Sequence, residues 1–227
     1  MVDTSRSQAG VLEPEREASH TFFDQVLRED KDLAFVAHFD TQVGILQRFT
    51  SSRQELAAAL DQLRIPGEVA TLLYEAIRQP SENLMRKQPG RKAFILLSDG
   101  VSFRDKTSIG AAIEYAQRAD TIIFSVLFSD HPKLDRPGRV AMHAIAAQHG
   151  RSAMQRLARE TSGAFFEVSD AQPIIDIYAQ IEETLRNQYA LGYTPQTAGK
   201  SGQYHKITLA TKTSGLVVQT RDGYFGR

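Results

Sequence analysis

RKAFILLSDG, residues 91–100, is the stretch that decides the fold class of this chain. Its centre, residues 93–97, is an unbroken apolar run, and Ser98-Asp99-Gly100 closes it. An apolar run without alternation predicts a strand that is buried on both faces, as central strands of parallel sheets are. Residues 121–128 (TIIFSVLF) form a second run of the same kind. The two runs therefore predict the middle of a parallel sheet.

Helical patterns surround these strands along the chain. Apolar spacing, caps and breakers predict helices at 14–28, from Ser51 or Ser52 to Pro66-Gly67, at 71–85, 108–119, 139–161 with an interruption near Gly150, and 173–187. Further strands are expected at 33–39 and 43–49, as a hairpin, and at 164–168. This alternation predicts an α/β fold: a Rossmann-like, doubly wound and mainly parallel sheet flanked by helices.

The last part of the chain has a different pattern. Residues 189–193, 205–210 and 216–221 resemble three short strands with glycine-containing turns and no helix between them. We therefore expect two units, an α/β domain at 1–188 and a small antiparallel β extension at 189–227.

Composition excludes several classes of function. The 227 residues include 27 Lys and Arg and 27 Asp and Glu, so the formal net charge is zero. The chain therefore lacks the excess of basic residues expected of a protein that binds nucleic acid or anionic membranes. There is no cysteine, which removes disulfides, thiolate zinc sites and cysteine nucleophiles. The longest apolar runs are far shorter than the roughly 18 residues of a membrane span.

A cluster of polar residues lies where strands end or helices begin. In Asp3-Thr4-Ser5-Arg6-Ser7, the side chains at alternate positions project to one side of an extended chain and can converge on one point. Thr71 and Asp99 occupy corresponding ends of their own elements, at the edge where parallel sheets bind ligands. Hydroxyl and carboxylate oxygens suit Mg²⁺, so we expect a cation site at Asp3, Ser5, Ser7, Thr71 and Asp99.

These five residues resemble the metal-ion-dependent adhesion site (MIDAS) of von Willebrand factor type A (VWA) domains. Five further stretches, FDTQVGILQRFT, RKAFILLSDG, LARETSGAFFEV, QYALGYTP and RDGYFGR, are similar to the VWA-related proteins of Acidobacteria. The resemblance implies that Ser5, Ser7 and Thr71 are direct ligands of Mg²⁺, or of Mn²⁺ or Ca²⁺, and that Asp3 and Asp99 support them.

The family's function follows from the resemblance as an expectation. It implies a non-enzymatic, protein-binding or adhesion-type domain whose cation engages a Glu or Asp carboxylate of a protein partner. It also implies export from the cytoplasm, as a secreted or periplasmic protein, although these residues contain no signal segment.

The chain departs from the family pattern in two ways. Arg6 and Val69-Ala70 stand where family members commonly have glycine, and we expect their bulk and the charge of Arg6 to weaken metal binding. Only Met1-Val2 precede Asp3, so the first central strand is expected to be truncated. The unfilled groove could accept a peptide or a dimer partner by strand addition, which predicts self-association at the incomplete sheet.

Other interpretations of the same residues remain. Asp3 and the serines could form a capping turn before the first helix, Thr71 could be a helix N-cap, and Asp99-Gly100 could be only a turn. A metal-free VWA scaffold within a larger assembly is one functional alternative. A Mg²⁺-dependent phosphotransfer enzyme with Asp3 as nucleophile is another, although no second acid stands two residues after Asp3.

Overall fold

The centre of the molecule is a six-stranded sheet. The structure is a computed structural model that describes residues 1–227 except 129–136, 188–202, 216–217, 219, 221–222 and 226–227. The strand order is β3-β2-β1-β4-β5-β6, and all neighbours are parallel except β2 and β3. The strands are β1 Val2–Asp3, β2 Ala34–Phe39, β3 Val43–Thr50, β4 Lys92–Ser98, β5 Thr121–Leu127 and β6 Phe165–Glu167. The predicted mainly parallel sheet is confirmed.

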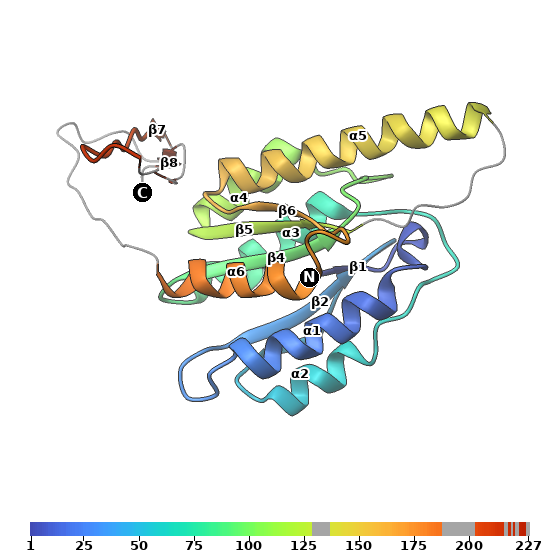
Figure 1. The fold of residues 1–227 in the computed structure, drawn as a ribbon, viewed down its shortest axis with the longest axis horizontal. Coiled ribbons are helices and arrows are strands. Elements are labelled where there is room, and N and C mark those ends of the chain that lie inside the picture. Colours follow the sequence, from blue (N-terminus) through green and yellow to red (C-terminus); the bar gives the residue numbers. More distant parts are fainter. Residues whose placement is uncertain (129–136, 188–202, 216–217, 219, 221–222, 226–227) are drawn as a thin grey trace.

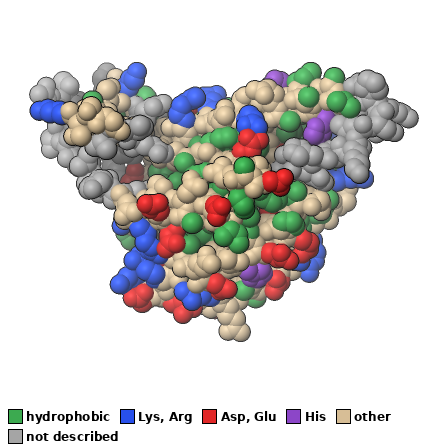
Figure 2. Space-filling view, viewed as in Figure 1, with side chains coloured by type: hydrophobic (Ala, Val, Ile, Leu, Met, Phe, Trp, Pro, Cys, Tyr) green, Lys and Arg blue, Asp and Glu red, His purple; other side chains and the backbone are tan. Residues whose placement is uncertain are grey.

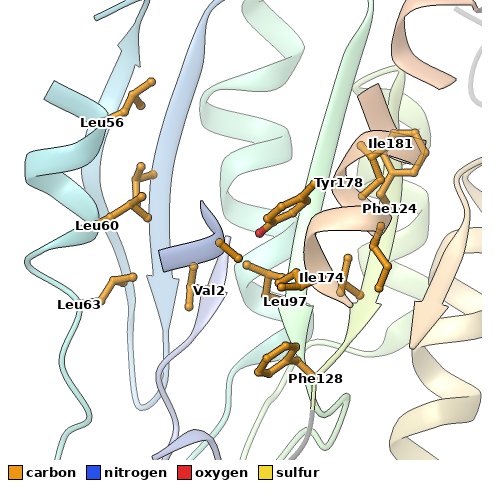
Figure 3. Packing of buried hydrophobic residues seen from close by; sticks show 14 of the residues in the cluster. Val2, Leu56, Leu60, Leu63, Leu97, Phe124, Phe128, Ile174, Tyr178 and Ile181 are labelled. Atoms are coloured by element: carbon orange, nitrogen blue, oxygen red, sulfur yellow. The ribbon is translucent and has the colours of Figure 1, made fainter. Parts of the chain in front are cut away.

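Helices cover both faces of this sheet (Figure 1). They are α1 Leu12–Val26, α2 Arg53–Leu60, α3 Leu73–Asn83, α4 Ile109–Arg118, α5 Pro137–Glu160 and α6 Ile174–Arg186, with short 3₁₀ helices at Arg6–Gln8 and Met85–Lys87. Helices α1, α2 and α6 bury one hydrophobic cluster against the sheet, and α3, α4 and α5 bury the other. Figure 3 shows the first cluster, in which Val2 and Leu97 of the central strands face Leu60 and Tyr178. The chain is therefore doubly wound.

Helix α5 corrects one prediction. The interruption expected near Gly150 is absent, because α5 continues through this residue from Pro137 to Glu160. Glycine is tolerated there because it lets the helix touch the backbone of the loop after β4: a Cβ on Gly150 would lie 2.3 Å from the Asp99 carbonyl oxygen. The glycine marks a close approach rather than a break.

Strand β1 is far shorter than its neighbours. It has two residues, against six in β2 and seven in β4. Val2 pairs with His38 of β2 and Leu97 of β4, so β1 occupies only the carboxyl-terminal part of the space between them. The next strand in the sequence, β2, pairs with one edge of β1, and β4 pairs with the other edge. This is the switch point of strand order, where ligands bind in open α/β sheets.

The C-terminal part contains a small two-stranded antiparallel sheet. Its strands are β7 Tyr204–Lys206 and β8 Gly223–Phe225, and the rings of His205 and Tyr224 stack across it with centroids 5.1 Å apart. The strand predicted at 189–193 lies outside the described residues, as does most of 216–221. Of the strand predicted at 205–210, only the start is in β7, and β8 lies after the range predicted for the last strand. No described helix combines the length and the apolar character needed to cross a bilayer.

Candidate functional site

Asp3 is the most buried residue of the site, at the carboxyl end of β1. Its side chain is fully enclosed, and both carboxylate oxygens accept hydrogen bonds. The backbone N–H of Ser5 donates to Oδ1 at 2.9 Å, and the hydroxyl of Ser98 donates to Oδ2 at 2.5 Å. Since Ser98 ends β4, these contacts join the ends of the two central strands. Asp3 is thereby fixed at the switch point.

The two serines follow Asp3 on a tight turn. The chain enters the 3₁₀ helix Arg6–Gln8 directly after Ser5, which brings Ser5 Oγ within 3.1 Å of Ser7 Oγ. Ser5 is buried, whereas Arg6 and Ser7 are exposed. The side chain of Arg6 therefore reaches the surface and does not fill the space beside the serines. The bulk expected at this position leaves the turn intact.

Asp99 begins the loop that follows β4. Its Oδ1 accepts a hydrogen bond from the N–H of Val101 at 2.9 Å, and the nearby side chains of Ser7 and Gln8 act to lower the pKa of the carboxyl group against the effect of burial. The same loop reaches Phe103, whose N–H and C=O both pair with the backbone of Thr71, at 3.0 and 2.9 Å. The loop after β4 thus carries Asp99 and pairs with the backbone at Thr71.

Asp40 connects Thr71 with the first loop, and it was not among the site residues predicted from the sequence. Its Oδ2 accepts from the hydroxyl of Thr4 at 2.8 Å, and its backbone C=O accepts from the N–H of Leu72 at 3.0 Å. Burial would raise the pKa of Asp40, but hydrogen bonds from Thr4, Gln42 and Thr41 lower it below its ordinary value. Asp40 therefore holds the segments of Thr4 and Thr71 together as a buried carboxylate.

The turn interpretation holds in part, because the carboxylates of Asp3 and Asp99 each accept the backbone N–H two residues later, and Ser5 is the N-cap of the 3₁₀ helix without a side-chain cap bond. Helix α1 starts at Leu12, separated from the serines by the 3₁₀ turn, and its N-cap is Val11. Helix α3 starts at Leu73, and Asp105, not Thr71, accepts the free N–H groups of Tyr74 and Glu75, at 2.7 and 3.1 Å. No hydrogen bond within either helix start uses the Thr71 hydroxyl or the serine hydroxyls.

The electrostatics of the site favour a positive charge. Burial, and then the neighbouring charge of Asp99, raise the pKa of Asp3 to about 7. Burial also raises the pKa of Asp99. Two carboxyl groups are thus held close together in a place where neither ionises easily, which is the effect of desolvation combined with like charge. A bound cation would offset both the burial of the two carboxylates and the repulsion between them, and would favour their ionised forms.

The donor set is mostly hydroxyl. In the part of the chain that the structure describes, no three Asp, Glu, His or Cys side chains gather closely enough to hold a metal ion by themselves. Ser5, Ser7 and Thr71 would have to supply the remaining oxygens. Hydroxyl and carboxylate oxygens are hard ligands, which fit Mg²⁺ better than a soft transition metal.

Hydrophobic side chains are exposed next to Thr71 and along one helix. Val69 is 51% exposed and Phe103, the backbone partner of Thr71, is 49% exposed. On α5, the side chains of Val140, Met142 and Ile145 are also exposed. Figure 2 shows hydrophobic residues at the surface toward the amino-terminal end of this helix, at the upper right. Exposed apolar groups beside a polar site are typical of a protein-binding surface.

The comparisons with known proteins agree with this architecture. The sequence model of the von Willebrand factor type A domain matches residues 1–180. Among curated proteins, none matches the chain significantly.

Solved structures match the fold at low sequence identity. An aerotolerance-related membrane protein from Bacteroides fragilis, carrying multiple mutations to serine, has a TM-score of 0.60 at 14% identity, over 82% of this chain and 96% of that one. A von Willebrand factor type A protein from Catenulispora acidiphila has 0.55 at 15%, over 80% and 40%. Proximal thread matrix protein 1 from the mussel byssus, with a zinc-occupied MIDAS motif, has 0.57 at 14%, over 80% and 42%. The family match covers most of the chain and the fold agrees with it, so this chain belongs to the von Willebrand factor type A domain family.

Proposed function

We propose that the loops after β1 and β4 and the segment before α3 hold a divalent cation, Mg²⁺, and present it to a protein partner. Ser5, Ser7 and Thr71 are the proposed direct ligands, and Asp3 and Asp99 support them through hydrogen bonds or water. The observation that carries the proposal is the pairing of Asp3 and Asp99, two buried carboxyl groups with raised pKa values, together with the Ser5 and Ser7 hydroxyls, which lie 3.1 Å apart. A cation bound here would offset the charge of the two carboxylates and could take the Ser5 and Ser7 hydroxyls as oxygen ligands.

The spacing of the serine hydroxyls is compatible with two neighbouring ligands of Mg²⁺. Ser5 Oγ and Ser7 Oγ are 3.1 Å apart. Neighbouring oxygens of an octahedron with bonds of 2.0–2.1 Å are about 2.9 Å apart, whereas the longer bonds of Ca²⁺ require about 3.4 Å. Mn²⁺ is the natural substitute for Mg²⁺ in binding experiments, since it also takes octahedral oxygen ligands.

The partner is proposed to be a protein that contributes a Glu or Asp carboxylate. When bound, Mg²⁺ supplies an open coordination position for such an oxygen, because it keeps exchangeable water ligands. Phe103 and Val69 offer apolar contact next to that position, which would add area to a small polar contact. Solved structures with the same fold include a pilus adhesin, SpaC from Lactobacillus rhamnosus GG.

A role as a phosphotransfer enzyme has less support from the geometry. A nucleophilic aspartate needs a free oxygen that faces its substrate. Asp3 is fully buried, and both of its oxygens already accept hydrogen bonds. VWA domains are in general adhesion or interaction modules, and we propose the same non-enzymatic role here.

We also propose an extracytoplasmic location and a division of the chain near residue 188. Structures with this fold include a membrane protein and a pilus adhesin, which supports the location. The family match ends at residue 180, and the antiparallel pair β7 and β8 follows α6, which supports the division.

Thermal unfolding with and without metal tests the proposed site. A ligand that binds only the folded state raises its stability, by about 2.7 kcal/mol at a concentration 100 times the Kd. We expect Mg²⁺ or Mn²⁺ to raise the Tm relative to EDTA, and Asp99→Ala to abolish the rise. Asp24→Ala, which changes an exposed carboxylate on α1, should leave the rise intact. If the protein is folded and neither metal changes its Tm, the metal-free scaffold is the better description.

A further inference from the structure

Phe103 and Arg104 form an exposed pair in the loop that follows β4. The Phe103 side chain is 49% exposed, and the guanidinium carbon of Arg104 lies 5.3 Å from the centre of its ring. This is the geometry of a cation–π contact, which holds the cation over one face of the ring. Aromatic and arginine side chains are also the residue types that most often carry the binding energy of protein interfaces. The pair therefore has the composition of a binding hot spot.

The backbone of this pair is fixed on both sides. The N–H and C=O of Phe103 pair with the backbone of Thr71. Directly after Arg104, the carboxylate of Asp105 accepts the N–H of Tyr74 at 2.7 Å. Arg104 itself has a φ of +62°, in the left-handed region that residues other than glycine rarely adopt. Such a conformation persists only where the surrounding structure imposes it, and it is concentrated at binding and switch sites.

The guanidinium group of Arg104 is available to an anion. Among the described residues it contacts the ring of Phe103 and has no hydrogen bond or carboxylate partner. The carboxylates of the adjoining segments are engaged elsewhere, since Asp105 accepts backbone N–H groups and Glu75 accepts hydrogen bonds from Arg78. A guanidinium that rests on a ring keeps the donors on its edge, and these match the two oxygens of a carboxylate. Arg104 thus offers a preoriented set of donors for a carboxylate.

Two other cations near the site lack this orientation. Arg6, between the two serines, and Lys106, two residues after Arg104, are also exposed and have no carboxylate partner in the part of the chain that the structure describes. Neither is held against a described aromatic ring. Glu68, three residues before Thr71, is an exposed acidic residue on the segment that precedes α3. Of the three cations, Arg104 is therefore the one that is held ready for a ligand.

We propose that Arg104 binds a second carboxylate of the partner protein, beside the carboxylate that engages the cation. This inference rests on the proposed function, which supplies the first of the two anion sites. Because Phe103 pairs with Thr71, a proposed ligand, the two anion sites lie on adjoining segments. In an extended segment, side chains two residues apart point to the same side, roughly 6.6 Å from each other. The partner motif is therefore an extended acidic pair, in which two Asp or Glu residues are separated by one uncharged residue.

Two labelled peptides test this motif on the full chain in Mg²⁺. The probe is acetyl-Ser-Glu-Thr-Glu-Ser-amide, and the control, acetyl-Ser-Glu-Thr-Gln-Ser-amide, has a single acid. Fluorescence anisotropy should show that the probe binds at least fivefold more tightly than the control, and that EDTA weakens its binding at least tenfold. Equal affinity of the two peptides overturns the proposal, as does probe binding that EDTA leaves unchanged or the absence of binding by either peptide.

Variants assign the gain in affinity to one side chain. Arg104→Gln should reduce the difference between the two peptides to about twofold or less, which is the advantage of having two acids that can reach the cation. Lys106→Gln removes a cation from the same loop and should keep the full difference. Loss of the difference in Arg6→Gln instead, or to the same extent in Lys106→Gln, would overturn the proposal.

Thermal unfolding separates this proposal from the one on which it rests. If Mn²⁺ raises the Tm and the single-acid peptide binds, but the second acid adds nothing, the cation site stands and the role of Arg104 is wrong. If neither metal changes the Tm of the folded protein, the proposed function fails and this inference fails with it. Arg104→Gln should keep the full rise in Tm with Mn²⁺. A variant without that rise would mean that Arg104 supports the loop and not the partner, which also overturns the proposal.

Discussion

Gly150 of α5 packs directly against the backbone of Asp99, with no room for a side chain between them. A Cβ on Gly150 would lie 2.3 Å from the Asp99 carbonyl oxygen. The contact is reciprocal, since a Cβ on Gly100 would lie 2.3 Å from the Gly150 carbonyl oxygen, and Gly100 has a φ of +77°. Helix α5 therefore fixes the loop that carries one of the two site carboxylates.

Gly150→Ala should displace the Asp99 loop and lower both stability and metal binding. Overpacking of this kind costs typically about 1–3 kcal/mol, and the better helix propensity of alanine offsets at most about 1 kcal/mol. Urea denaturation with and without Mg²⁺ measures both effects. We expect a lower unfolding free energy in EDTA and a smaller gain on adding Mg²⁺.

Gly110→Ala is the matched control, in helix α4. A Cβ there would meet only Ser108 Oγ, at 3.9 Å, which is an ordinary contact. This variant should gain up to about 1 kcal/mol and keep its response to Mg²⁺. If Gly150→Ala behaves in the same way, the loop is not held by the close approach.

The fold could be predicted from the sequence because the patterns that indicate its strands and helices are local. The apolar runs at 93–97 and 121–128 predict buried parallel strands. Strand β4 extends one residue beyond the first run at each end, and β5 ends one residue before the end of the second. The error at Gly150 arose because a glycine within a helical pattern is read as a break. Only the tertiary contact with Asp99 shows why it is compatible with a continuous helix.

The site was predictable only in part. Asp3, Ser5, Ser7, Thr71 and Asp99 stand at strand ends or helix starts, which sequence patterns locate. Asp40 and Asp105 were missed, and Ser98 was noted only as part of the segment after the strand, although each fixes a segment of the site through a buried or partly buried hydrogen bond. Their partners lie 30 or more residues away, and no local pattern reports such a contact. The position of Asp40, directly after β2, was the only available signal.

Asp40→Ala should loosen the link between the segments of Thr4 and Thr71. It removes an acceptor for the hydroxyls of Thr4 and Thr41 and the N–H of Gln42, of which the Thr4 hydroxyl is buried and keeps only its longer contacts with Phe39 and His38. We expect a loss of about 1–3 kcal/mol in urea denaturation, with weaker Mn²⁺ binding by titration calorimetry. Asp40→Asn, which keeps an acceptor oxygen, should lose less. An unchanged Mn²⁺ affinity in the alanine variant would show that Asp40 does not position the site.

The metal-free protein should lose stability as pH rises from about 4 to about 7. Asp3 has a pKa of about 7 when folded against an ordinary value of 3.8, so the folded state binds more protons in this window. The unfolding free energy then falls with rising pH, by on the order of 1 kcal/mol per pH unit. Urea denaturation in EDTA at several pH values measures the slope, and Asp3→Asn should flatten it. Saturating Mg²⁺ should reduce the fall, because it favours the ionised carboxylates. A wild-type slope that is unchanged in Asp3→Asn would assign the effect to another group.

Glu15 provides a second pH-dependent prediction, at a residue outside the proposed ligand set. It is fully buried on α1, and neither carboxylate oxygen has a hydrogen-bond partner among the described residues. Burial first, and then the charge of Asp3, raise its pKa well above the ordinary value. Its contribution to stability is therefore complete at low pH and is lost as pH rises, because the folded state resists ionisation.

Glu15→Gln should stabilise the protein at pH 8 and change it little at pH 5. At pH 5 the buried carboxyl group holds its proton and the amide replaces a neutral group of the same size. At pH 8 the wild type either ionises the group in an apolar place or unfolds more easily to release the proton, at a cost of about 1–3 kcal/mol. Thermal or urea unfolding at both pH values measures the difference. Glu17→Gln, which is exposed on the same helix, should show no such dependence. An equal effect of Glu15→Gln at both pH values would mean that Glu15 is already charged and paired in the folded protein.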